Sequence, residues 1–455
     1  MTSESGERMR AAGMSRSGAA RHAAQVATLL ASLRDLGASA VNRAVRYWIP
    51  GRIEVLGKHT DYAGGRSLLC AVERGFTMVA APRTDAHMTI MDARTAEIAE
   101  CDIGPEMSGP ARHWSTYPIT VARRIARDFP TLGRVRGVDI AFASDLPRAA
   151  GVSSSSALVV STFLALADAN ELLSLPEFSA HITDNEHLAG YLGAVENGWS
   201  FGHLSGDTGV GTLGGSEDHT AILCARPHEL VQYTFRPVHF ERAVPVPAGH
   251  TFAIGVSGVR AEKTGAARER YNRASRSMSV IVDLWRRATG RSEATAAAVI
   301  TSSPTALDEL RAVITAADTS ETGLTAQQLL TRLDHFVVES EALVPAASDA
   351  LARGDLVAFG DIVDRSQARA ERLLENQIDE TVELARSARE LGAVAASAFG
   401  AGFGGSVWAL VRSDTADDFL RRWERRHRER FPSSGSGDDE SFFITDAGPA
   451  AIRIE

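Results

Sequence analysis

Six residues near the end of the chain, Gly400–Gly405, hold four glycines in the order Gly-Ala-Gly-Phe-Gly-Gly. An apolar run, Val407–Val411, follows almost at once and has the composition of a buried strand. Glycine lacks a Cβ, so its backbone reaches positive φ angles and lets another group approach closely. A flexible linker also uses glycine, but it would not stand between the small apolar run Ala393–Ala398 and a strand. The pattern therefore predicts a tight loop held inside a folded domain.

A second unusual segment combines small residues with four consecutive serines, Ser153–Ser156. A strand-like run, Val138–Phe142, precedes it, and a helix-like run, Ala157–Ala169, follows it. Backbone N–H groups at such a turn can point at one anion, and the helix N-terminus adds the positive end of its dipole. A serine cap on the helix is the alternative, although one serine suffices for a cap. The loop lacks the Gly-Lys-Ser/Thr of a P-loop. We expect phosphate to contact these residues: Gly151, Ser153, Ser154, Ser155 and Ser156.

The third segment, Pro50–Gly65, places Arg52 in a short strand and then packs Lys58, His59 and Asp61 between glycines. Asp61 can accept two hydrogen bonds from hydroxyl groups, and His59 can donate or accept one. A polar turn closed by an Asx hydrogen bond is the alternative. These residue types favour a site for a ligand rich in hydroxyl groups.

Together the three segments resemble the galactokinase branch of the GHMP small-molecule kinases. The first family signature, approximately Pro-Gly-Arg-x-x-x-x-Gly-Glu-His-Thr-Asp-Tyr, matches residues 50–62 except at Lys58. The second, Pro-x-Gly-Ala-Gly-Leu-Ser-Ser-Ser-Ala, matches residues 147–156 with three changes, and the third matches residues 400–405 in full. The resemblance extends from about Tyr47 to the end of the sequence. Three ordered motifs are far more specific than any one of them.

The resemblance implies an α+β fold of two domains, an N-terminal ribosomal-protein-type α/β domain and a C-terminal ferredoxin-like α+β domain, with the active site in the cleft between them. Strand-like runs and turns alternate in the first half of the chain, and helical spacing dominates from about Ser257 to Leu391. We place the two domains at residues 21–250 and 251–455. Residues 1–20 are polar and small, and we expect them to be disordered, whereas Arg21–Leu36 has the spacing of a helix.

Composition excludes several classes of protein. The chain has 455 residues, is 23% charged, and carries a formal charge of −9, which leaves no electrostatic footprint for nucleic acid or an anionic membrane. Its three cysteines are widely spaced and form neither a metal knuckle nor a disulfide framework, which favours a reducing compartment. No apolar run reaches the ~18–20 residues of a membrane span. We expect a cytoplasmic enzyme, a monomer or homodimer, without nucleic-acid or membrane partners.

The resemblance implies transfer of the γ-phosphate of ATP to the anomeric hydroxyl of galactose or a related monosaccharide or uronic acid. The comparable family loop reads Gly-x-Met-Asp-Gln and leads into an apolar strand. Ala221–Cys224 supplies the apolar run here, so the register favours Asp218 over Glu217 as the catalytic carboxylate. We expect Arg52 to pair with Asp218 and to keep it ionised near neutral pH. The sequence leaves open whether Asp218 accepts the proton or only orients the hydroxyl.

Magnesium and adenine sites follow from the same resemblance. A serine of the phosphate loop, Ser154 or Ser155, and Glu196 on a later helix are expected to face Mg²⁺. An exposed helical glutamate is the alternative for Glu196. A Trp-x-x-Tyr pair near the adenine in the family is matched by Trp114 and Tyr117, which would otherwise be a buried aromatic pair.

The remaining site residues also come from the resemblance. The third motif, with Gly402 and Gly404, is expected beside the phosphates and the loop that bears Asp218. Tyr271 is alternatively a tyrosine of the helix core. We expect the sugar to contact five residues: Lys58, His59, Asp61, Gly215 and Tyr271.

Lys58 departs from the family, which has glutamate at this position. An acceptor-only carboxylate has become a donor-only ammonium. This exchange suits an acceptor on the substrate, so we hypothesise a uronic acid, or another hexose or pentose, in place of galactose. The alternative is that Lys58 turns outward, or pairs with an acid such as Asp61, and leaves galactose preference intact.

Two further points stay open at the level of sequence. Residues 199–211 look like an insertion of about ten residues, either a cover for the active site or a surface loop. The function has two alternatives, a GHMP kinase for a non-sugar alcohol and a non-catalytic sugar sensor built on the kinase fold. The intact His59-Thr60-Asp61-Tyr62 signature argues against the first. The complete serine loop, with Arg52 and Asp218 both present, argues against the second.

Overall fold

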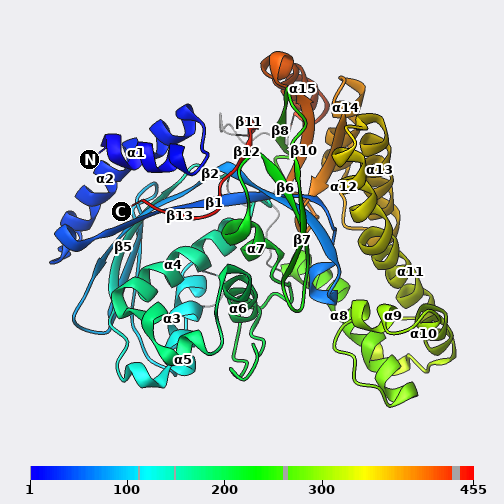
Figure 1. The fold of residues 1–455 in the computed structure, drawn as a ribbon, viewed down its shortest axis with the longest axis horizontal. Helices are drawn as coiled ribbons and strands as arrows, with labels where there is room; N and C mark the ends of the chain where they lie inside the picture. The colour runs from blue at the N-terminus through cyan, green and yellow to red at the C-terminus, as the bar shows by residue number, and fades with distance from the viewer. Residues whose placement is uncertain (1, 111–112, 148–149, 260–264, 433–440, 455) are drawn as a thin grey trace.

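The computed structural model describes residues 2–110, 113–147, 150–259, 265–432 and 441–454. The fold is α+β, as expected, with a large sheet at one side, a small sheet at the other, and a helical extension beyond the small sheet (Figure 1). Helices cover both faces of the large sheet, so its two central strands are buried along almost their whole length.

The large sheet has the strand order β13-β1-β2-β5-β3-β4, with β6 and β12 also paired to β2 and β7 paired to β6. Only the β3–β5 pair is parallel among these described strands. Its strands are β1 (Val45–Leu56), β2 (Arg66–Pro82), β3 (His87–Asp92), β4 (Glu97–Asp102), β5 (Val138–Ser144), β6 (Glu229–Thr234), β7 (His239–Pro245), β12 (Ala447–Gly448) and β13 (Ile452–Arg453).

Strand β1 is irregular where the first motif begins. Its pairing with β2 shifts register between Pro50 and Arg52 and again between Glu54 and Leu56. Proline has no N–H to give to the ladder, and a bulge changes the direction of the side chains that follow it. Arg52 and Glu54 both line the cleft described below.

The helices of the first half lie on two sides of the large sheet (Figure 1). Helix α2 packs on one face against β2 and β5, and α4 packs on the other face against β1 and β2. The helices are α1 (Thr2–Ala11), α2 (Arg16–Asp35), α3 (Thr116–Asp128), α4 (Ser154–Asn170), α5 (Pro176–Ser179), α6 (Asn185–Asn197) and α7 (Glu217–Cys224).

The expectation of disorder over residues 1–20 is wrong. Thr2–Ala11 and Arg16–Asp35 are helices, because Met9 and Met14 bury their side chains against Trp48 and the closing strand. Sequence composition had suggested otherwise because the segment is rich in small and polar residues, and only tertiary packing gives the two methionines a partner.

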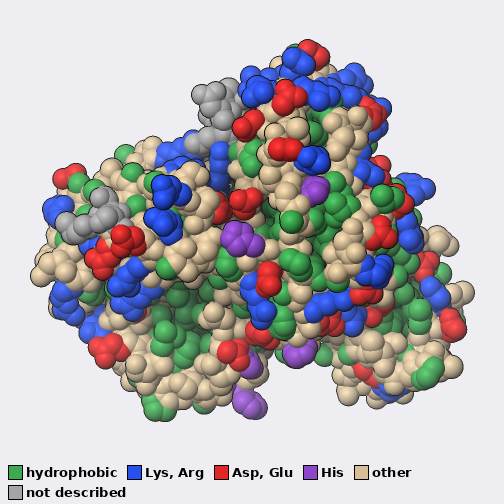
Figure 2. All heavy atoms as spheres, turned by 45° about the horizontal axis from the view of Figure 1, so that its top comes forward, with side chains coloured by type: hydrophobic (Ala, Val, Ile, Leu, Met, Phe, Trp, Pro, Cys, Tyr) green, Lys and Arg blue, Asp and Glu red, His purple; other side chains and the backbone are tan. Residues whose placement is uncertain are grey.

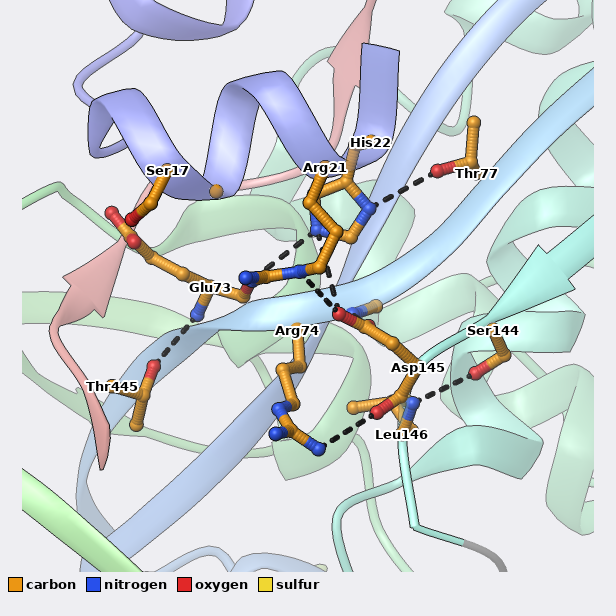
Figure 3. A network of polar contacts seen from close by, with 12 residues as sticks. Ser17, Arg21, His22, Glu73, Arg74, Thr77, Ser144, Asp145, Leu146 and Thr445 are labelled. Atoms are coloured by element: carbon orange, nitrogen blue, oxygen red, sulfur yellow. Dashed lines mark hydrogen bonds and ion pairs between the residues drawn. The ribbon is translucent and has the colours of Figure 1, made fainter. Parts of the chain in front are cut away.

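A polar network fixes α2 on the sheet (Figure 3). Arg21 Nε donates to Asp145 Oδ2 at 3.0 Å, and Arg21 Nη2 donates to the Glu73 carbonyl at 3.0 Å. His22, fully buried, contacts Thr77 Oγ1 through Nδ1 at 3.1 Å. Asp145 also accepts from the Gly75 N–H at 2.7 Å. The network therefore anchors the chain just before it enters the serine-rich loop.

The small sheet is antiparallel in the order β11-β8-β10-β9. Helices α14 (Asp379–Glu390) and α15 (Ala416–Arg430) cover one face, with Trp423 buried against Leu384 and Phe442. The other face packs through Trp408 and Phe252 into the core shared with the large sheet. The strands are β8 (His250–Val256), β9 (Ala395–Phe399), β10 (Ser406–Arg412) and β11 (Phe442–Thr445).

The later helices form the extension and the cover of the small sheet (Figure 1). Two π-helical turns, Val338–Leu343 and Ala370–Leu374, interrupt them. The helices are α8 (Gly265–Thr289), α9 (Ala296–Thr301), α10 (Ala306–Ala316), α11 (Ala326–Val337), α12 (Val344–Ala352), α13 (Leu356–Arg369), α14 (Asp379–Glu390) and α15 (Ala416–Arg430).

The placement of residues 251–455 in one C-terminal domain needs a correction. The small sheet does begin at β8, close to the expected boundary. However, β12 and β13 return to the large sheet, where Ala447 pairs with Val72 and Ile452 pairs with Trp48. The last strands were assigned by their position in the sequence, and strand pairing is a long-range property.

The described surface carries charges of both signs. Figure 2 shows Lys and Arg side chains interspersed with Asp and Glu on the face in view. Within the described ranges, no helix is both long enough and apolar enough to cross a bilayer.

Candidate active site

The three sequence motifs meet at one cleft. Arg52, from the first motif, donates through Nη1 to the Gly151 carbonyl of the serine-rich loop at 2.5 Å. Ser406, which follows the glycine loop, donates to the Ala150 carbonyl at 2.6 Å. His59 Nε2 lies 3.1 Å from the Ala401 carbonyl. Segments about 50, 150 and 400 residues along the chain therefore share a wall, as a single site requires.

Arg52 and Asp218 form the central ion pair. Arg52 is 4% exposed, and its Nη2 and Nε lie 2.7 and 2.8 Å from Asp218 Oδ1. Glu217 Oε1 is farther from Arg52, at 4.0 Å. Burial lowers the pKa of Arg52, but the Asp218 and Glu217 carboxyl groups outweigh burial and leave the pKa above its ordinary value. The geometry thus selects Asp218, the residue that the sequence register favoured.

The assignment of Asp218 from the sequence assumed that a strand follows it, and that assumption is wrong. Residues 221–224 are not a strand: they lie in helix α7, which begins at Glu217. Asp218 consequently stands in the first turn of a helix, where the positive end of the helix dipole stabilises a carboxylate. An apolar run of four residues is compatible with a strand or with a helix. Here the run forms a helix that is buried under the large sheet.

Glu54, which the sequence did not single out, and Glu217, which the register ranked below Asp218, line the cleft beside the ion pair. Burial raises the pKa of Glu54 to about 7, and Glu54 hydrogen-bonds to Glu217. Burial, together with Glu54 and Asp61, raises the pKa of Glu217 well above its ordinary value. Glu217 also accepts from Ser67 Oγ at 2.6 Å. Glu54 is two residues after Arg52 on the same strand, so strand alternation was the signal that could have identified it.

The side chains that follow Gly57 in the first motif form hydrogen bonds within the protein. His59 Nε2 donates to Ala401, and His59 Nδ1 accepts from the Tyr62 hydroxyl at 2.9 Å. Arg332 donates to the Tyr62 hydroxyl at 3.0 Å. Both His59 nitrogens are therefore engaged, and the centroid of the His59 ring lies 5.3 Å from that of the Tyr271 ring.

Asp61 is in direct contact with the segment that leads to Asp218. Asp61 accepts from the Tyr62 N–H at 2.8 Å and from the Glu217 N–H at 3.3 Å. Gly215 must be glycine here, because a Cβ on it would lie 2.3 Å from Asp61 Oδ2. Asn197 holds this segment from the other side: its Oδ1 accepts from the Gly214 N–H at 2.6 Å. Asp61, Gly215 and Tyr271 all line the cleft, as expected for substrate-contacting residues.

Lys58 does not line the cleft, which corrects the expectation of a substrate contact. Its side chain is 1% exposed and points away, donating through Nζ to Ser397 Oγ at 2.7 Å and to Ser366 Oγ at 3.4 Å. Ser366 donates in turn to Glu339 Oε1 at 2.8 Å. Lys58 is also close enough to Glu54 to lower the pKa of that carboxyl. The lysine therefore offsets buried carboxyl charge, and neither alternative considered from sequence anticipated this inward position.

The serine-rich loop leads into α4, which begins at Ser154. Arg148 and Ala149 of this motif lie outside the described residues. Ser156 Oγ donates to Glu196 Oε2 at 2.9 Å and lies 3.3 Å from Asp218 Oδ2. Glu196 Oε2 also lies 3.0 Å from His219 Nε2. Glu196 is thus a buried residue of the cleft, and the serine that meets it is Ser156, whereas Ser154 or Ser155 was expected.

The glycine loop has the conformation that its composition predicts. Gly402 has φ 78°, and a Cβ there would lie 2.3 Å from the Asn376 carbonyl oxygen. Gly404 has φ 130°, and even Phe403 adopts φ 62°. Gly400 and Ala401 reach the cleft wall. The loop is therefore held between α13–α14 and the serine-rich loop, as a packed turn and not a linker.

Trp114 and Tyr117 lie at the start of α3 and pack against the core of the large sheet. The Trp114 ring meets Phe142 edge to face, with ring centroids 6.1 Å apart. Neither residue belongs to the lining of the central cleft. Phe142 lies in β5, the strand that leads into the serine-rich loop, so the pair is placed on the approach to that loop.

Residues 199–211 do not cover the cleft. Arg123 of α3 donates through Nε to Asp207 at 2.6 Å and through Nη2 to the Thr208 carbonyl. Phe201 packs edge to face on Tyr191 of α6 at 5.9 Å. The segment is therefore an ordered addition alongside α3 and α6, and only the next residue, Thr212, lines the cleft.

Family models match three parts of the chain. The GHMP kinases N terminal domain matches residues 116–198, and GHMP kinases C terminal matches residues 347–429. The galactokinase galactose-binding signature matches residues 45–82, which include Arg52 and Asp61.

Whole-chain relatives agree with these matches. A galactokinase from Chloroflexus aggregans is 28% identical over 377 residues, 82% of this chain and 85% of the relative. A galactokinase from Chloroflexus aurantiacus is 28% identical over 404 residues, 87% and 90% of the two chains. The structure of Lactococcus lactis galactokinase complexed with galactose superposes with a TM-score of 0.73 at 22% identity, covering 94% of this chain and 99% of that one. The last similarity establishes the fold.

Proposed function

Because the chain belongs to the GHMP kinases, in their galactokinase-like branch, we propose that it transfers the γ-phosphate of ATP to the anomeric hydroxyl of galactose or a closely related neutral monosaccharide. The observation that carries this proposal is the Arg52–Asp218 pair, which stands between the serine-rich loop on one side and Asp61 and Tyr271 on the other. A phosphoryl transfer needs the acceptor hydroxyl next to such a carboxylate and in line with the γ-phosphate, so the sugar and phosphate sites must be neighbours.

Asp218 accepts the proton of the attacking hydroxyl in the proposed mechanism. Arg52 directs two N–H groups at one oxygen of Asp218, Oδ1, so Oδ2 is oriented toward Ser156 and the cleft. The fixed guanidinium also places positive charge where the hydroxyl develops negative charge. Positioning and electrostatics of this kind supply most of the rate in phosphoryl transfer.

The cleft favours a neutral sugar over a uronic acid. Four carboxyl groups, those of Glu54, Asp61, Glu196 and Glu217, line it beside the ion pair. Lys58, the cation on which a uronate site would depend, is buried against Ser397 and does not line the cleft. The carboxylate of a uronic acid would meet these carboxyl groups in a poorly solvated site, which costs free energy. We therefore replace the uronate hypothesis with a neutral hexose, galactose first.

ATP and Mg²⁺ are the proposed cosubstrate and cofactor. The backbone of residues 151–156 and the N-terminus of α4 would hold the phosphates. Ser156 Oγ and the Glu196 carboxylate are 2.9 Å apart, and a hydroxyl and a carboxylate are oxygen donors of the kind that Mg²⁺ takes. When bound there, the metal would offset charge on the phosphates. Gly402 and Gly404 keep the neighbouring loop close to the serine-rich loop, and Trp114 and Tyr117 would approach the base.

The proposal also covers the domain organisation, the compartment and the oligomeric state. Residues 2–250 and 251–446 form the two domains of the catalytic unit, with α1 and α2 in the first and the last strands returning to it. The three cysteines, Cys70, Cys101 and Cys224, are free thiols, which fits work in a reducing cytoplasm as a monomer or homodimer.

A coupled ADP-release assay with MgATP tests the function. The panel contains galactose, glucose, arabinose, galacturonate, glucuronate and mevalonate. We expect turnover on galactose or another neutral sugar, a loss of about 10²–10⁴-fold in kcat in Asp218→Asn, and normal rates in the exposed-site control Asp418→Asn.

Other outcomes identify the alternatives. Turnover on mevalonate alone would establish a kinase of non-sugar alcohols. Galactose binding by calorimetry without ADP release would establish a sugar sensor. Turnover that survives in Asp218→Asn would remove Asp218 from the mechanism.

A further inference from the structure

A second concave site lies next to the catalytic loop. It is a groove of about 550 Å³ between α6, the added segment after α6, and the turn that joins β6 to β7. Its size and largely apolar lining are those of small-molecule sites, which are usually clefts of about 300–1,000 Å³ with a few polar groups. The groove and the catalytic cleft share Gly215 as a common wall.

The groove has a smooth floor and an aromatic wall. Gly190 and Gly193 of α6 line the floor without side chains. Phe201 lies over α6, and a Cβ on Gly190 would be 3.0 Å from its ring. Trp199 forms part of the wall. A floor of this kind, bounded by flat rings, fits a planar ligand that stacks.

The polar groups around the groove favour a negative charge. The Arg236 guanidinium lies 4.8 Å from the centre of the Trp199 ring, and its Nη1 donates to the Tyr62 carbonyl at 3.1 Å. Within the described ranges, no carboxylate lies at ion-pair distance from Arg236, although Asp61 is near enough to oppose the lowering of the Arg236 pKa by burial. His181 and His203 stand at the same groove with ring centroids 6.2 Å apart.

The one carboxylate of the lining is already engaged. Glu186 Oε2 accepts from the Phe240 N–H at 3.3 Å, on the outer side of the groove. Apart from Glu186, the charged and polar side chains of the described lining are Arg236, His181, His187, His203, Ser200 and Ser216, beside the rings of Trp199 and Phe201. A cation stacked on tryptophan, with no described carboxylate at ion-pair distance, is a ready partner for an organic anion.

We propose that this groove is a second ligand site, which takes a planar organic anion and is coupled to the catalytic loop. The anionic group meets Arg236, and the ring stacks between Trp199 and the floor of α6. Five residues of its described lining, 199–203, come from the added segment 199–211, which does not line the catalytic cleft.

The coupling follows from shared backbone. Ser216 lines the groove and directly precedes α7, the helix that carries Asp218. Gly193 packs closely against Ser216, because a Cβ on Gly193 would lie 2.6 Å from Ser216 Cβ. Asn197, at the end of α6, donates to the Gly215 carbonyl at 3.1 Å. A ligand that presses on α6 or Ser216 therefore changes the position of the catalytic loop, and a binding free energy shared between two sites is reciprocal.

Naphthalene-2-sulfonate is the probe, since it is planar and anionic. Its binding to the full chain is measured by calorimetry and by saturation-transfer NMR, with and without MgATP, and the ADP-release rate is measured at saturation. We expect saturable binding at one site that MgATP does not displace, and a change of at least twofold in kcat.

Two variants report on the groove. Arg236→Gln removes the cation, and Ala180→Trp fills the mouth of the groove from an exposed position. We expect each to weaken the probe at least tenfold, whereas the exposed-site controls Arg287→Gln and Ala352→Trp leave its affinity unchanged. Both variants lie outside the catalytic cleft, and their melting temperatures are compared with that of the parent chain.

Three results overturn the proposal: no saturable binding at millimolar probe, equal affinity in the parent chain and both groove variants, or displacement by MgATP. Binding without any change in kcat refutes the coupling. The binding measurement needs no catalysis, so its failure is distinguishable from a failure of the proposed kinase function.

Discussion

Arg52 and Asp218 face each other from β1 and α7, and two guanidinium nitrogens of Arg52 lie within 2.8 Å of a single oxygen, Asp218 Oδ1. This arrangement fixes the carboxylate and leaves its second oxygen toward Ser156. The third guanidinium nitrogen donates to the Gly151 carbonyl, so one side chain joins the proposed catalytic carboxylate to the serine-rich loop. Arginine can do this because its donors form a rigid fork.

Arg52→Lys should therefore impair catalysis even though it keeps the charge. Lysine presents one ammonium group and cannot meet Asp218 and Gly151 in the same geometry. We expect kcat to fall by about 10²-fold or more with a smaller change in KM, since the fork acts on the reacting geometry. Steady-state kinetics of ADP release measure both constants. Arg83→Lys, in an ion pair outside the cleft, is the matched control, and an equal effect of both changes would contradict the assignment.

Lys58→Met should destabilise the protein without changing its choice of sugar. The change removes the ammonium group between Ser397, Ser366 and the nearby Glu54, and it leaves buried carboxyl charge uncompensated. Breaking a buried ion network by removing one partner costs about 3–5 kcal/mol. Thermal unfolding measures the loss, and the sugar panel measures specificity. Ser397→Ala is the milder control, at about 1 kcal/mol. A reordered ranking of sugars in Lys58→Met would restore a role for Lys58 in recognition.

Stability should fall as the pH rises through neutrality because of Glu54 and Glu217. The folded-state pKa of Glu54 is raised to about 7 by burial, and that of Glu217 is raised well above its ordinary value, also by burial. A carboxyl with a raised folded-state pKa contributes stability that is complete below its unfolded pKa and is lost as the pH rises through its folded pKa. The window for Glu54 is therefore about pH 5 to pH 8, and the two groups titrate as a pair.

Glu217→Gln isolates this effect. Glutamine keeps the shape and can donate to Glu54, so less carboxyl charge must be buried at pH 8. We expect the variant to lose about 1–3 kcal/mol less stability than the parent chain between pH 5 and pH 8. Denaturant unfolding at several pH values measures it, with the exposed Glu100→Gln as control. Parallel pH profiles of the parent chain and Glu217→Gln would show that the pair does not carry a buried charge.

Ser156→Ala should raise the magnesium concentration needed for half-maximal rate more than Ser155→Ala does. Ser156 Oγ is the hydroxyl that contacts both Glu196 and Asp218, whereas Ser155 is a partly exposed residue of the same helical turn. Loss of one oxygen donor weakens a hard-cation site, and we expect a shift of about tenfold. The rate is measured against free Mg²⁺ at fixed MgATP. A larger effect of Ser155→Ala would return the metal contact to the residue expected from sequence.

Much of the fold was predictable because the elements have strong local signals. The helix at Ala157–Ala169, the strand at Val138–Phe142 and the packed glycine loop were all expected, and the structure contains them with longer bounds. The α+β architecture and the shared cleft followed from three motifs that match one family. The helix at residues 221–224 was misassigned, because four apolar residues carry no periodicity that separates a strand from a helix.

The sequence could not predict the directions in which the side chains of the site point. Lys58 sits between residues that line the cleft, yet it points to Ser397, which is more than 300 residues away along the chain. Glu54 and Glu217 gain their significance only because burial brings them together. The same is true of Met9 and Met14, which order the N-terminal helices by packing on Trp48.

The sequence by itself determined the backbone conformations and the chemical identity of the site, because glycine at residues 400–405, the serines before α4 and the Arg52–Asp61 motif act locally through backbone freedom and donor type. Tertiary structure alone decided which groups share the cleft, which carboxyl groups are buried and which way Lys58 turns. Those properties depend on desolvation and on contacts between distant segments, and neither can be read from a short stretch of the sequence.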